Sequence, residues 1–291
     1  MLFFTDTEVK MTDEEFTLLR DLIYNYCGLY FSAENMFLLE RRLSSRLAHF
    51  QLATFNDYYY YLRYDLNRDQ ELSDIMDLLT TNETYFFRES FQLKAFTDEI
   101  IPELFSRKKQ RADRVLRIWS AGCSTGEEAY TIAMLLLENL DLTGWKIEIV
   151  GTDISQRVLH QARKGVYGSS AFRVTEPHYK SRYFVEQDGG HRVSDKIREF
   201  VTFSRLNLYD QSRYLFLGKM DIIFCRNVII YFDQPAKKRI IENFYNTLIP
   251  GGFLLLGHSE SLMNISTAFK LRHFKNDMVY EKPIVAGDLL P

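Results

Sequence analysis

The feature that most constrains the fold is a strand–turn–helix pattern near the middle of the chain. The apolar run Val115–Trp119 predicts a strand, residues Ser120–Gly126 are small, and Glu127–Leu140 has the spacing of a helix. An open α/β sheet holds nucleotide-like ligands at such a turn, at the carboxyl end of its first strand. A second predicted strand, Trp145–Val150, leads into Asp153, and an acidic residue there typically accepts hydrogen bonds from ribose hydroxyls. The pattern therefore predicts a nucleotide-type site on a mainly parallel sheet.

The chemistry of this turn argues against a phosphate ligand. It has neither a GxGxxG nor a Gly-Lys-Ser/Thr signature, because its glycines are only Gly122 and Gly126. Glu127 and Glu128 stand at the helix N-terminus, where they would repel a pyrophosphate but suit a ligand that carries an amine and a sulfonium. Either glutamate alone is equally well explained as an ordinary first-turn acid favoured by the helix dipole. Together with Asp153, the pair favours S-adenosylmethionine over NAD or ATP.

Composition is that of a soluble globular protein and argues against a general nucleic-acid binder. The 291 residues suffice for one large or two smaller domains, with 46% hydrophobic and 26% charged residues and a net charge of −3. The first residues predict no secretory signal, and the longest apolar run, around Ile222–Phe232, is interrupted by Arg226 and Asn227. The three cysteines show no metal-binding spacing, so we expect reduced thiols, no metal and a cytoplasmic protein.

The first 90 residues predict a small all-helical domain. Thr12 and Glu15 have capping-box spacing, and apolar residues follow at helical intervals as far as Cys27. Three further helices are expected, at Met36–Phe50, Thr54–Tyr64 and Asp69–Leu79. Residues 91–114 are expected to form a longer helix, Phe91–Phe105, in spite of Pro102, followed by a solvated charged linker, Arg107–Arg114.

From residue 115 to residue 291 the pattern changes to strands that alternate with helices. Such alternation predicts a mainly parallel sheet with helices on both faces. The further strands are expected at Phe200–Ser204, Met220–Phe224 and Gly252–Leu256, the further helices at Gln156–Arg163 and Gln234–Leu248, and a closing hairpin at Lys270–Phe274 and Met278–Lys282. The stretch from about 165 to 200 is too long for a simple connection, and Gly189-Gly190 is a turn signal within it, so we expect an inserted β-rich subdomain there.

Five blocks of sequence, in order, resemble the CheR-type chemotaxis protein methyltransferases. They are NETYFFRE (82–89), SAGCSTGEEAY (120–130), GTDIS (151–155), FCRNVIIYFD (224–233) and GHSESL (257–262). The resemblance implies a Class I methyltransferase fold, with a Rossmann-like, mainly parallel seven-stranded sheet and an antiparallel C-terminal hairpin. It also implies transfer of the methyl group of S-adenosylmethionine to chemoreceptor glutamates, which gives γ-glutamyl methyl esters and the product S-adenosylhomocysteine.

The resemblance also implies which residues form the site. Asn82, Thr84 and Arg88 would line the cofactor from the connector between the domains. Glu128, with Glu127, would meet the methionine end, and Asp153 would hold the ribose. The remaining cofactor residues would be Asn207 and Leu208 around the adenine, and Arg226 and Asn227 at the end of the fourth strand.

The expected chemistry needs no general base. A glutamate acceptor has a reference pKa of about 4.3 and is already ionised at neutral pH. The enzyme must instead orient a carboxylate oxygen in line with the S–CH3 bond and exclude water. A guanidinium is well shaped to hold a carboxylate, and a tyrosine can orient it or shape the methyl pocket, so Arg88 and Tyr231 are the expected catalytic residues.

Simpler roles remain open for several of these residues. Tyr231 follows an apolar strand and could be a packing aromatic with a solvated hydroxyl, and Asn82 could be a helix or turn cap. His258 fits a residue that organises its loop by hydrogen bonds at least as well as a catalytic base. Cys225 beside Arg226 lacks the Pro-Cys context of cytosine methyltransferases, so we expect a buried thiol.

Chemoreceptor docking is expected at two places. Arg41, Arg42 and Arg46 could bind an acidic receptor helix, although a solvated face paired with acids such as Glu40 explains them almost as well. Some family members use the β-insertion to grip a receptor C-terminal peptide, but the turn Glu186–His191 looks shorter here, so we expect a peptide-independent enzyme. Non-catalytic alternatives are an S-adenosylmethionine sensor or a docking module of the same fold, and a nucleic-acid or small-molecule acceptor is a further alternative.

Overall fold

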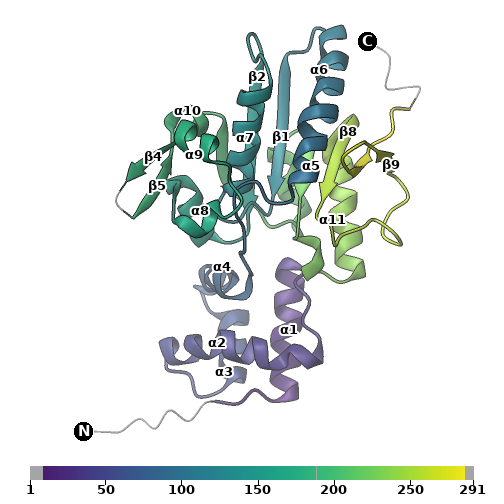
Figure 1. Ribbon diagram of the computed structural model, residues 1–291. Helices are drawn as coiled ribbons and strands as arrows, with labels where there is room; N and C mark the ends of the chain where they lie inside the picture. Colours follow the sequence, from purple (N-terminus) through teal and green to yellow (C-terminus); the bar gives the residue numbers. More distant parts are fainter. Residues whose placement is uncertain (1–8, 188, 286–291) are drawn as a thin grey trace. The chain divides into compact units, whose positions relative to one another are not determined.

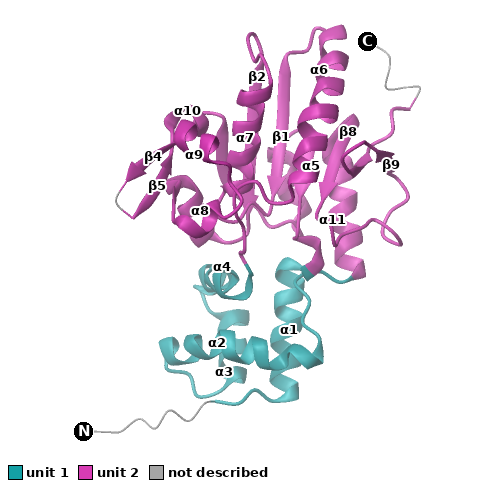
Figure 2. Cartoon of the chain, viewed as in Figure 1, with its two compact units in different colours: residues 1–81, 231–233 teal, residues 82–230, 234–291 magenta. Residues whose placement is uncertain are grey.

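The computed structural model describes residues 9–187 and 189–285 and divides into two compact units (Figures 1 and 2). One unit takes in residues 1–81 together with 231–233, and the other takes in residues 82–230 and 234–291. The described parts contain no helix long and apolar enough to cross a membrane.

The first unit is helical and follows the predicted pattern closely. Its elements are α1 (Asp13–Cys27), the 3-10 turn η1 (Ala33–Asn35), α2 (Met36–Phe50), α3 (Phe55–Tyr64) and α4 (Arg68–Leu79). The predicted capping box is present, because Thr12 accepts from the backbone N–H of Glu15 and the Glu15 carboxylate accepts from that of Thr12. Helix α1 ends at Gly28, whose φ of 76° is the left-handed conformation that favours glycine. The apolar faces of these helices form the core of the unit, with Leu19, Ile23, Leu39 and Leu43 fully buried.

Three residues from a distant part of the sequence complete this helical unit. Phe232 forms an isolated antiparallel bridge with Leu29, and the backbone N–H of Tyr30 donates to the carbonyl of Tyr231 at 3.2 Å. The hydroxyl of Tyr24 donates to the Asp233 carboxylate at 3.0 Å. Residues 231–233 are therefore held by α1 and the loop that follows it, although they come after a strand of the other unit in sequence.

The second unit is built on the predicted seven-stranded sheet, in the order β6-β2-β1-β7-β8-β10-β9. The five strands β6, β2, β1, β7 and β8 run parallel, and β10 and β9 close the sheet as an antiparallel hairpin. The strand bounds are β1 Val115–Ala121, β2 Lys146–Asp153, β6 Val201–Arg205, β7 Met220–Cys225, β8 Leu248–Leu256, β9 Lys270–His273 and β10 Met278–Glu281. This topology confirms the Class I methyltransferase fold that the sequence predicts.

Helices cover the sheet on both faces. On one face, α7 (Glu127–Asn139) packs with buried side chains of β1 and β2 such as Ile118 and Ile149. On the other face, the indole of Trp119 meets Phe244 of α11 (Gln234–Thr247) and Tyr214 of the 3-10 segment η4 (Gln211–Phe216), both edge to face. A crossover through α8 (Gln156–Lys164) and the insertion joins β2 to β6. The carboxyl ends of β1, β2, β7 and β8 consequently meet at one edge of the sheet.

The stretch before the first strand differs from its prediction. Its helix is divided into α5 (Ser90–Ala95), a π-helical segment (Phe96–Ile100) and α6 (Ile101–Gln110). Pro102 lies in the first turn of α6, where its missing N–H is tolerated. The expected solvated linker is wrong for its first four residues, which are helical. Lys108 is only 9% exposed, because its ammonium pairs with Asp113 and with Asp221 of β7, each at 2.7 Å.

The predicted insertion forms a small antiparallel sheet, in the order β3-β5-β4, with short helices beside it. Its elements are β3 (Val166–Tyr167), η3 (Ser169–Phe172), α9 (Pro177–Tyr183), β4 (Phe184–Gln187), β5 (Gly190–Val193) and α10 (Asp195–Arg198). Gln187 pairs directly with Gly190, so two residues separate the strands of this hairpin, and one of them, Asp188, lies outside the described residues. A Cβ at Gly190 would lie 2.3 Å from the carbonyl oxygen of Tyr167, which explains the glycine.

Candidate active site

The turn after β1 is held against the end of β2. The backbone N–H groups of Gly122 and Cys123 both donate to the carbonyl of Thr152, at 2.8 and 2.9 Å. Gly122 and Gly126 have φ values of 78° and 93°, which favour glycine. A Cβ on Gly122 would also lie 2.5 Å from Cγ2 of Val228, in the loop after β7. The small residues seen in the sequence are therefore needed where two post-strand loops approach each other.

Asp153 closes this turn from the side of β2. Its carboxylate accepts from the backbone N–H of Ser124 at 2.9 Å and from that of Ser155 at 3.0 Å, and the residue is buried. The backbone N–H of Leu206, at the end of β6, donates to the Asp153 carbonyl at 3.0 Å. The predicted ribose residue thus lies at the carboxyl end of β2, directly beside the first turn.

The two glutamates of the turn have different surroundings. Glu127 is 3% exposed, and its carboxylate accepts from the Thr125 hydroxyl at 2.7 Å. Burial raises the pKa of Glu127 to about 7. Glu128 instead accepts from the Ser120 hydroxyl at 2.7 Å and pairs with the Arg226 guanidinium at 3.1 Å. Only Glu128 joins the network of polar residues at the strand ends.

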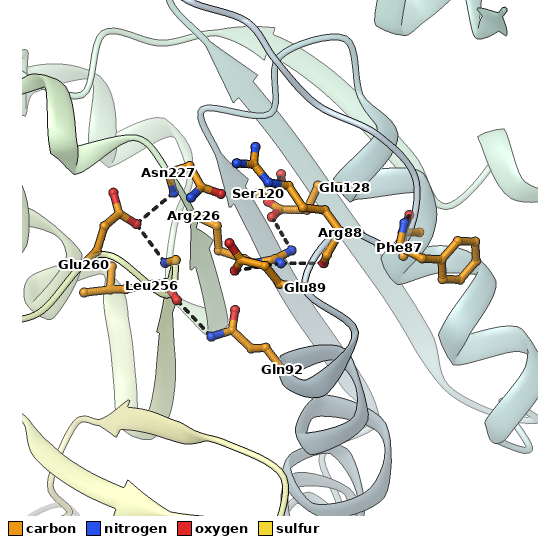
Figure 3. A network of polar contacts seen from close by, with 12 residues as sticks. Phe87, Arg88, Glu89, Gln92, Ser120, Glu128, Arg226, Asn227, Leu256 and Glu260 are labelled. Atoms are coloured by element: carbon orange, nitrogen blue, oxygen red, sulfur yellow. Dashed lines mark hydrogen bonds and ion pairs between the residues drawn. The ribbon is translucent and has the colours of Figure 1, made fainter. Parts of the chain in front are cut away.

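Arg226, at the end of β7, is the centre of that network (Figure 3). Its side chain is buried, and its guanidinium pairs with Glu128 and with Glu89, both at 3.1 Å. The same guanidinium donates to the backbone carbonyl of Arg88 at 2.5 Å. A buried arginine needs such partners, because an unpaired charge away from water is costly. Arg226 therefore joins β7, α7 and the connector before α5.

That connector carries three of the predicted cofactor residues. The backbone carbonyl of Asn82 accepts from the hydroxyl of Ser124 in the first turn, at 3.1 Å. Thr84 and Arg88 are half-buried, and the Arg88 guanidinium donates to the carbonyl of Glu83 at 3.0 Å. Phe86 anchors the segment, because its buried ring packs against Tyr167, Phe172 and Phe184 of the insertion.

The predicted adenine residues lie in the loop after β6. The side-chain oxygen of Asn207 accepts from the backbone N–H of Tyr209 at 3.0 Å. Leu208 is buried, and its carbonyl accepts from the Tyr214 hydroxyl at 2.8 Å. Since the backbone N–H of Leu206 donates a hydrogen bond to the carbonyl of Asp153, this loop begins at the same edge of the sheet as Asp153, the residue predicted to hold the ribose.

Asn227 and Glu260 form a second part of the network. Asn227 has a φ of 60°, and its backbone N–H donates to the Glu260 carboxylate at 2.8 Å. Its side-chain oxygen is buried and has no hydrogen-bond partner among the described residues. The sequence left two roles open for His258, a catalytic base or a residue that organises this loop by hydrogen bonds. His258 is instead exposed, and Glu260, two residues later, makes the loop's hydrogen bonds.

The second unit thus brings together ten of the predicted residues. They come from the connector, the turn after β1, the end of β2 and the loops after β6 and β7, and they are Asn82, Thr84, Arg88, Glu127, Glu128, Asp153, Asn207, Leu208, Arg226 and Asn227. Tyr231 belongs to the helical unit and is 37% exposed. The sequence did not point to Glu89 and Glu260, whose partners are 137 and 33 residues away along the chain.

Two of the three arginines expected to dock a receptor have partners within the helical unit. Arg46 forms a two-pronged pair with the buried carboxylate of Glu71, with its Nε 2.7 Å from Oε1. Arg42 donates to the carbonyl of Leu79 at 2.5 Å. Arg41 is exposed. The suggested partner of this face, Glu40, pairs instead with Lys10 at 3.1 Å.

Comparison with known proteins agrees with this fold. A family model for the SAM-binding domain of CheR methyltransferases matches residues 82–278, and one for their all-alpha domain matches residues 14–80. The chain belongs to the CheR methyltransferase family. Chemotaxis protein methyltransferase 2 of Vibrio cholerae is 36% identical over 278 residues, which cover 95% of each chain. Chemotaxis protein methyltransferase of Borreliella burgdorferi is 37% identical over 257 residues, which cover 87% of this chain and 90% of the relative.

Proposed function

We propose that this CheR-family protein transfers the methyl group of S-adenosylmethionine to glutamate side chains of chemoreceptors and forms γ-glutamyl methyl esters. Its similarity to chemotaxis protein methyltransferases over nearly the full length of both chains carries the proposal. The second unit adds support, because the ends of its strands carry the polar residues Glu128, Asp153, Arg226 and Asn227. The scattered, buried free cysteines, Cys27, Cys123 and Cys225, are in keeping with a cytoplasmic site of action.

The residues present fit S-adenosylmethionine. Asp153 would hold the ribose and Asn207 and Leu208 would border the adenine, while the buried side-chain oxygen of Asn227, unpartnered among the described residues, offers an acceptor to an ammonium group. Glu128, with Glu127, would meet the charged methionine end, and Arg88 would line the site from the connector. When bound, the cofactor supplies a methyl group on a positively charged sulfur, which a carboxylate can attack directly.

The protein's own task is then to orient the acceptor and exclude water. A glutamate with a pKa of about 4.3 needs no base at neutral pH. We assign Arg88 to holding the acceptor carboxylate, because a guanidinium matches its two oxygens, and Tyr231 to orienting it or shaping the methyl pocket. Both assignments rest on the chemistry and on the family resemblance.

Labelled cofactor and receptor-containing membranes test the proposal. With methyl-labelled S-adenosylmethionine we expect base-labile label on the receptor, whereas cofactor binding without transfer would indicate a sensor. Arg88→Ala should lower kcat by about 100-fold at saturating cofactor, since a misplaced reactant costs on that order. Arg173→Ala is the matched control, because Arg173 contacts Glu83 and Tyr85 of the same connector. Full transfer and unchanged cofactor affinity in Arg88→Ala would rule out its role.

We further propose that the enzyme works without a receptor-peptide tether. The hairpin of the insertion turns within two residues between Gln187 and Gly190 and leaves little loop to grip a peptide. Receptors with and without their C-terminal peptide should therefore be methylated at equal rates.

Receptor docking is proposed to use Arg41, an exposed arginine of α2, whereas Arg42 donates a hydrogen bond to the Leu79 carbonyl. Arg41→Glu should therefore weaken receptor methylation more than Arg42→Glu, when both variants are compared at a temperature at which they are folded.

A further inference from the structure

One carboxylate organises the loop that follows β7. Glu260 accepts four backbone N–H groups: from Asn227 at 2.8 Å, Val228 at 2.9 Å, Ile230 at 3.3 Å and Gly257 at 2.8 Å. Burial raises the pKa of this carboxyl, and the four donors act in the opposite direction. Figure 3 shows Glu260 beside Asn227, on the side of the network away from Glu128.

These contacts fix Asn227 in a conformation that it would rarely adopt alone. Its φ of 60° lies in the left-handed region. A Cβ on Gly257 would come within 2.8 Å of the Asn227 backbone nitrogen, 2.9 Å of its side-chain nitrogen and 3.0 Å of Glu260 Oε2. The side-chain oxygen of Asn227 is left buried and unpartnered among the described residues. The loop is therefore built to hold an acceptor ready for a ligand.

The same contacts reach the first turn. Glu260 binds the N–H of Val228, whose side chain occupies the space that a Cβ of Gly122 would need. The first turn and the loop after β7 are thus packed against each other, and Glu260 holds the loop after β7 through its backbone N–H groups. A shift of the loop would move both Asn227 and the support of Gly122.

We propose that Glu260 is a positioning residue for the S-adenosylmethionine site, which acts through Asn227 and Val228 and touches neither cofactor nor acceptor. The inference rests on the proposed cofactor, but not on the identity of the methyl acceptor. A carboxylate suits this role, because it accepts several N–H bonds in fixed directions and donates none.

Glu260→Gln tests the role with almost no change in shape. One of the two carboxylate oxygens of Glu260 becomes an amide NH2 group, which cannot accept from the backbone N–H donors that face it. The loop after β7 should therefore lose its conformation. We expect the Kd for S-adenosylhomocysteine to rise about tenfold to 100-fold, the range found when outer support of a ligating group is removed in metal sites. KM for S-adenosylmethionine should rise with it.

Glu99→Gln is the matched control. Glu99 similarly accepts the backbone N–H groups of Lys275 and Asn276, at 2.8 and 3.3 Å, in the turn between β9 and β10. The Glu99→Gln variant should lose about as much stability as Glu260→Gln and should keep the wild-type affinity for S-adenosylhomocysteine. If Glu260→Gln loses stability like Glu99→Gln but binds S-adenosylhomocysteine as the wild type does, Glu260 is structural only and the proposal fails.

Hydrogen exchange on the unaltered protein gives a test that does not depend on how the variant folds. The amides of Asn227 and Val228 should exchange slowly already without ligand, since Glu260 holds them. Fast exchange that becomes slow only when S-adenosylhomocysteine binds would overturn the proposal. Wild-type protein that binds S-adenosylhomocysteine but methylates no receptor would contradict the proposed function and leave the role of Glu260 intact.

Discussion

At the scale of single residues, neighbours in sequence have different environments. Glu127 and Glu128 carry the same charge and begin the same helix, yet one is buried beside Thr125 and the other is paired with Arg226. Successive helix positions point about 100° apart, so adjacent side chains meet different parts of the fold. The acidic charge that favoured a cationic ligand is therefore partly neutralised by the protein's own arginine.

The buried Glu127 predicts a dependence of stability on pH. Burial raises its pKa from 4.5 to about 7, so the folded state keeps a proton that the unfolded state has lost. The contribution of this group to the free energy of unfolding should be constant below pH 4.5, fall between pH 4.5 and about 7 by up to about 3 kcal/mol, and level off above that. Denaturant unfolding at pH 5 and pH 8 measures the difference.

Glu127→Gln should remove this dependence, because glutamine is always neutral and can still accept from Thr125. The variant should match the wild type near pH 5 and exceed it in stability at pH 8. Glu14→Gln, at an exposed position of α1, is the control and should leave the pH profile unchanged. Parallel profiles for Glu127→Gln and wild type would show that Glu127 is ionised in the folded state.

Long-range polar pairs explain why the sequence revealed only part of the site. Strand ends and small-residue turns placed Gly122 and Asp153, since these features are local. The partners of Arg226 lie 98 and 137 residues away, and no local pattern reports them. Glu260 was not singled out, since three of its four N–H donors lie 30 to 33 residues away, and His258 was considered both as a base and as a residue that organises the loop.

At the scale of elements, apolar periodicity and capping chemistry predicted most helices and strands to within a few residues. The capping box of Thr12 and the apolar run of β1 are signals within one segment. The π-helical segment at Phe96–Ile100 and the burial of Lys108 depend on tertiary contacts, and the latter requires Asp221 from β7. Charge runs are usually solvated, so the sequence favoured the wrong environment for Lys108.

Gly122→Ala tests the close approach of the two post-strand loops. Alanine would be strained at a φ of 78° and would meet Val228 at 2.5 Å, so we expect a loss of about 2–4 kcal/mol in stability and weaker cofactor binding. Gly144→Ala isolates the strain, because Gly144 has a φ of 77° and a Cβ added there would meet nothing within 4 Å among the described residues. That control should cost about 1 kcal/mol.

The double variant Gly122→Ala with Val228→Ala separates the two causes. If the contact with Val228 matters, the second substitution should recover part of the lost stability and the two effects should not add. Strictly additive losses, measured by denaturant unfolding, would show that backbone strain alone explains the glycine.

At the scale of the whole molecule, the chain leaves the second unit for three residues and returns. Residues 231–233 have their contacts with the helical unit, through Leu29, Tyr30 and Tyr24. The sequence predicted Tyr231 as a site residue from its motif, but it could not show that Tyr30, in the loop after α1, bonds its backbone. The proposed catalytic role of Tyr231 therefore depends on a segment whose backbone and side-chain contacts are with the helical unit.

Tyr24→Phe tests that role. The substitution removes the hydroxyl that donates to Asp233 at 3.0 Å, a bond worth about 1 kcal/mol or somewhat more because the acceptor is charged. The segment that carries Tyr231 should loosen, and kcat should fall about fivefold, while the Kd for S-adenosylhomocysteine stays unchanged because the predicted cofactor residues belong to the other unit. Tyr60→Phe makes the same chemical change on an exposed residue of α3 and should leave kcat unaltered. A full kcat in Tyr24→Phe would show that the helical unit does not position Tyr231, and an equal loss of cofactor affinity would show that the damage spreads beyond this segment.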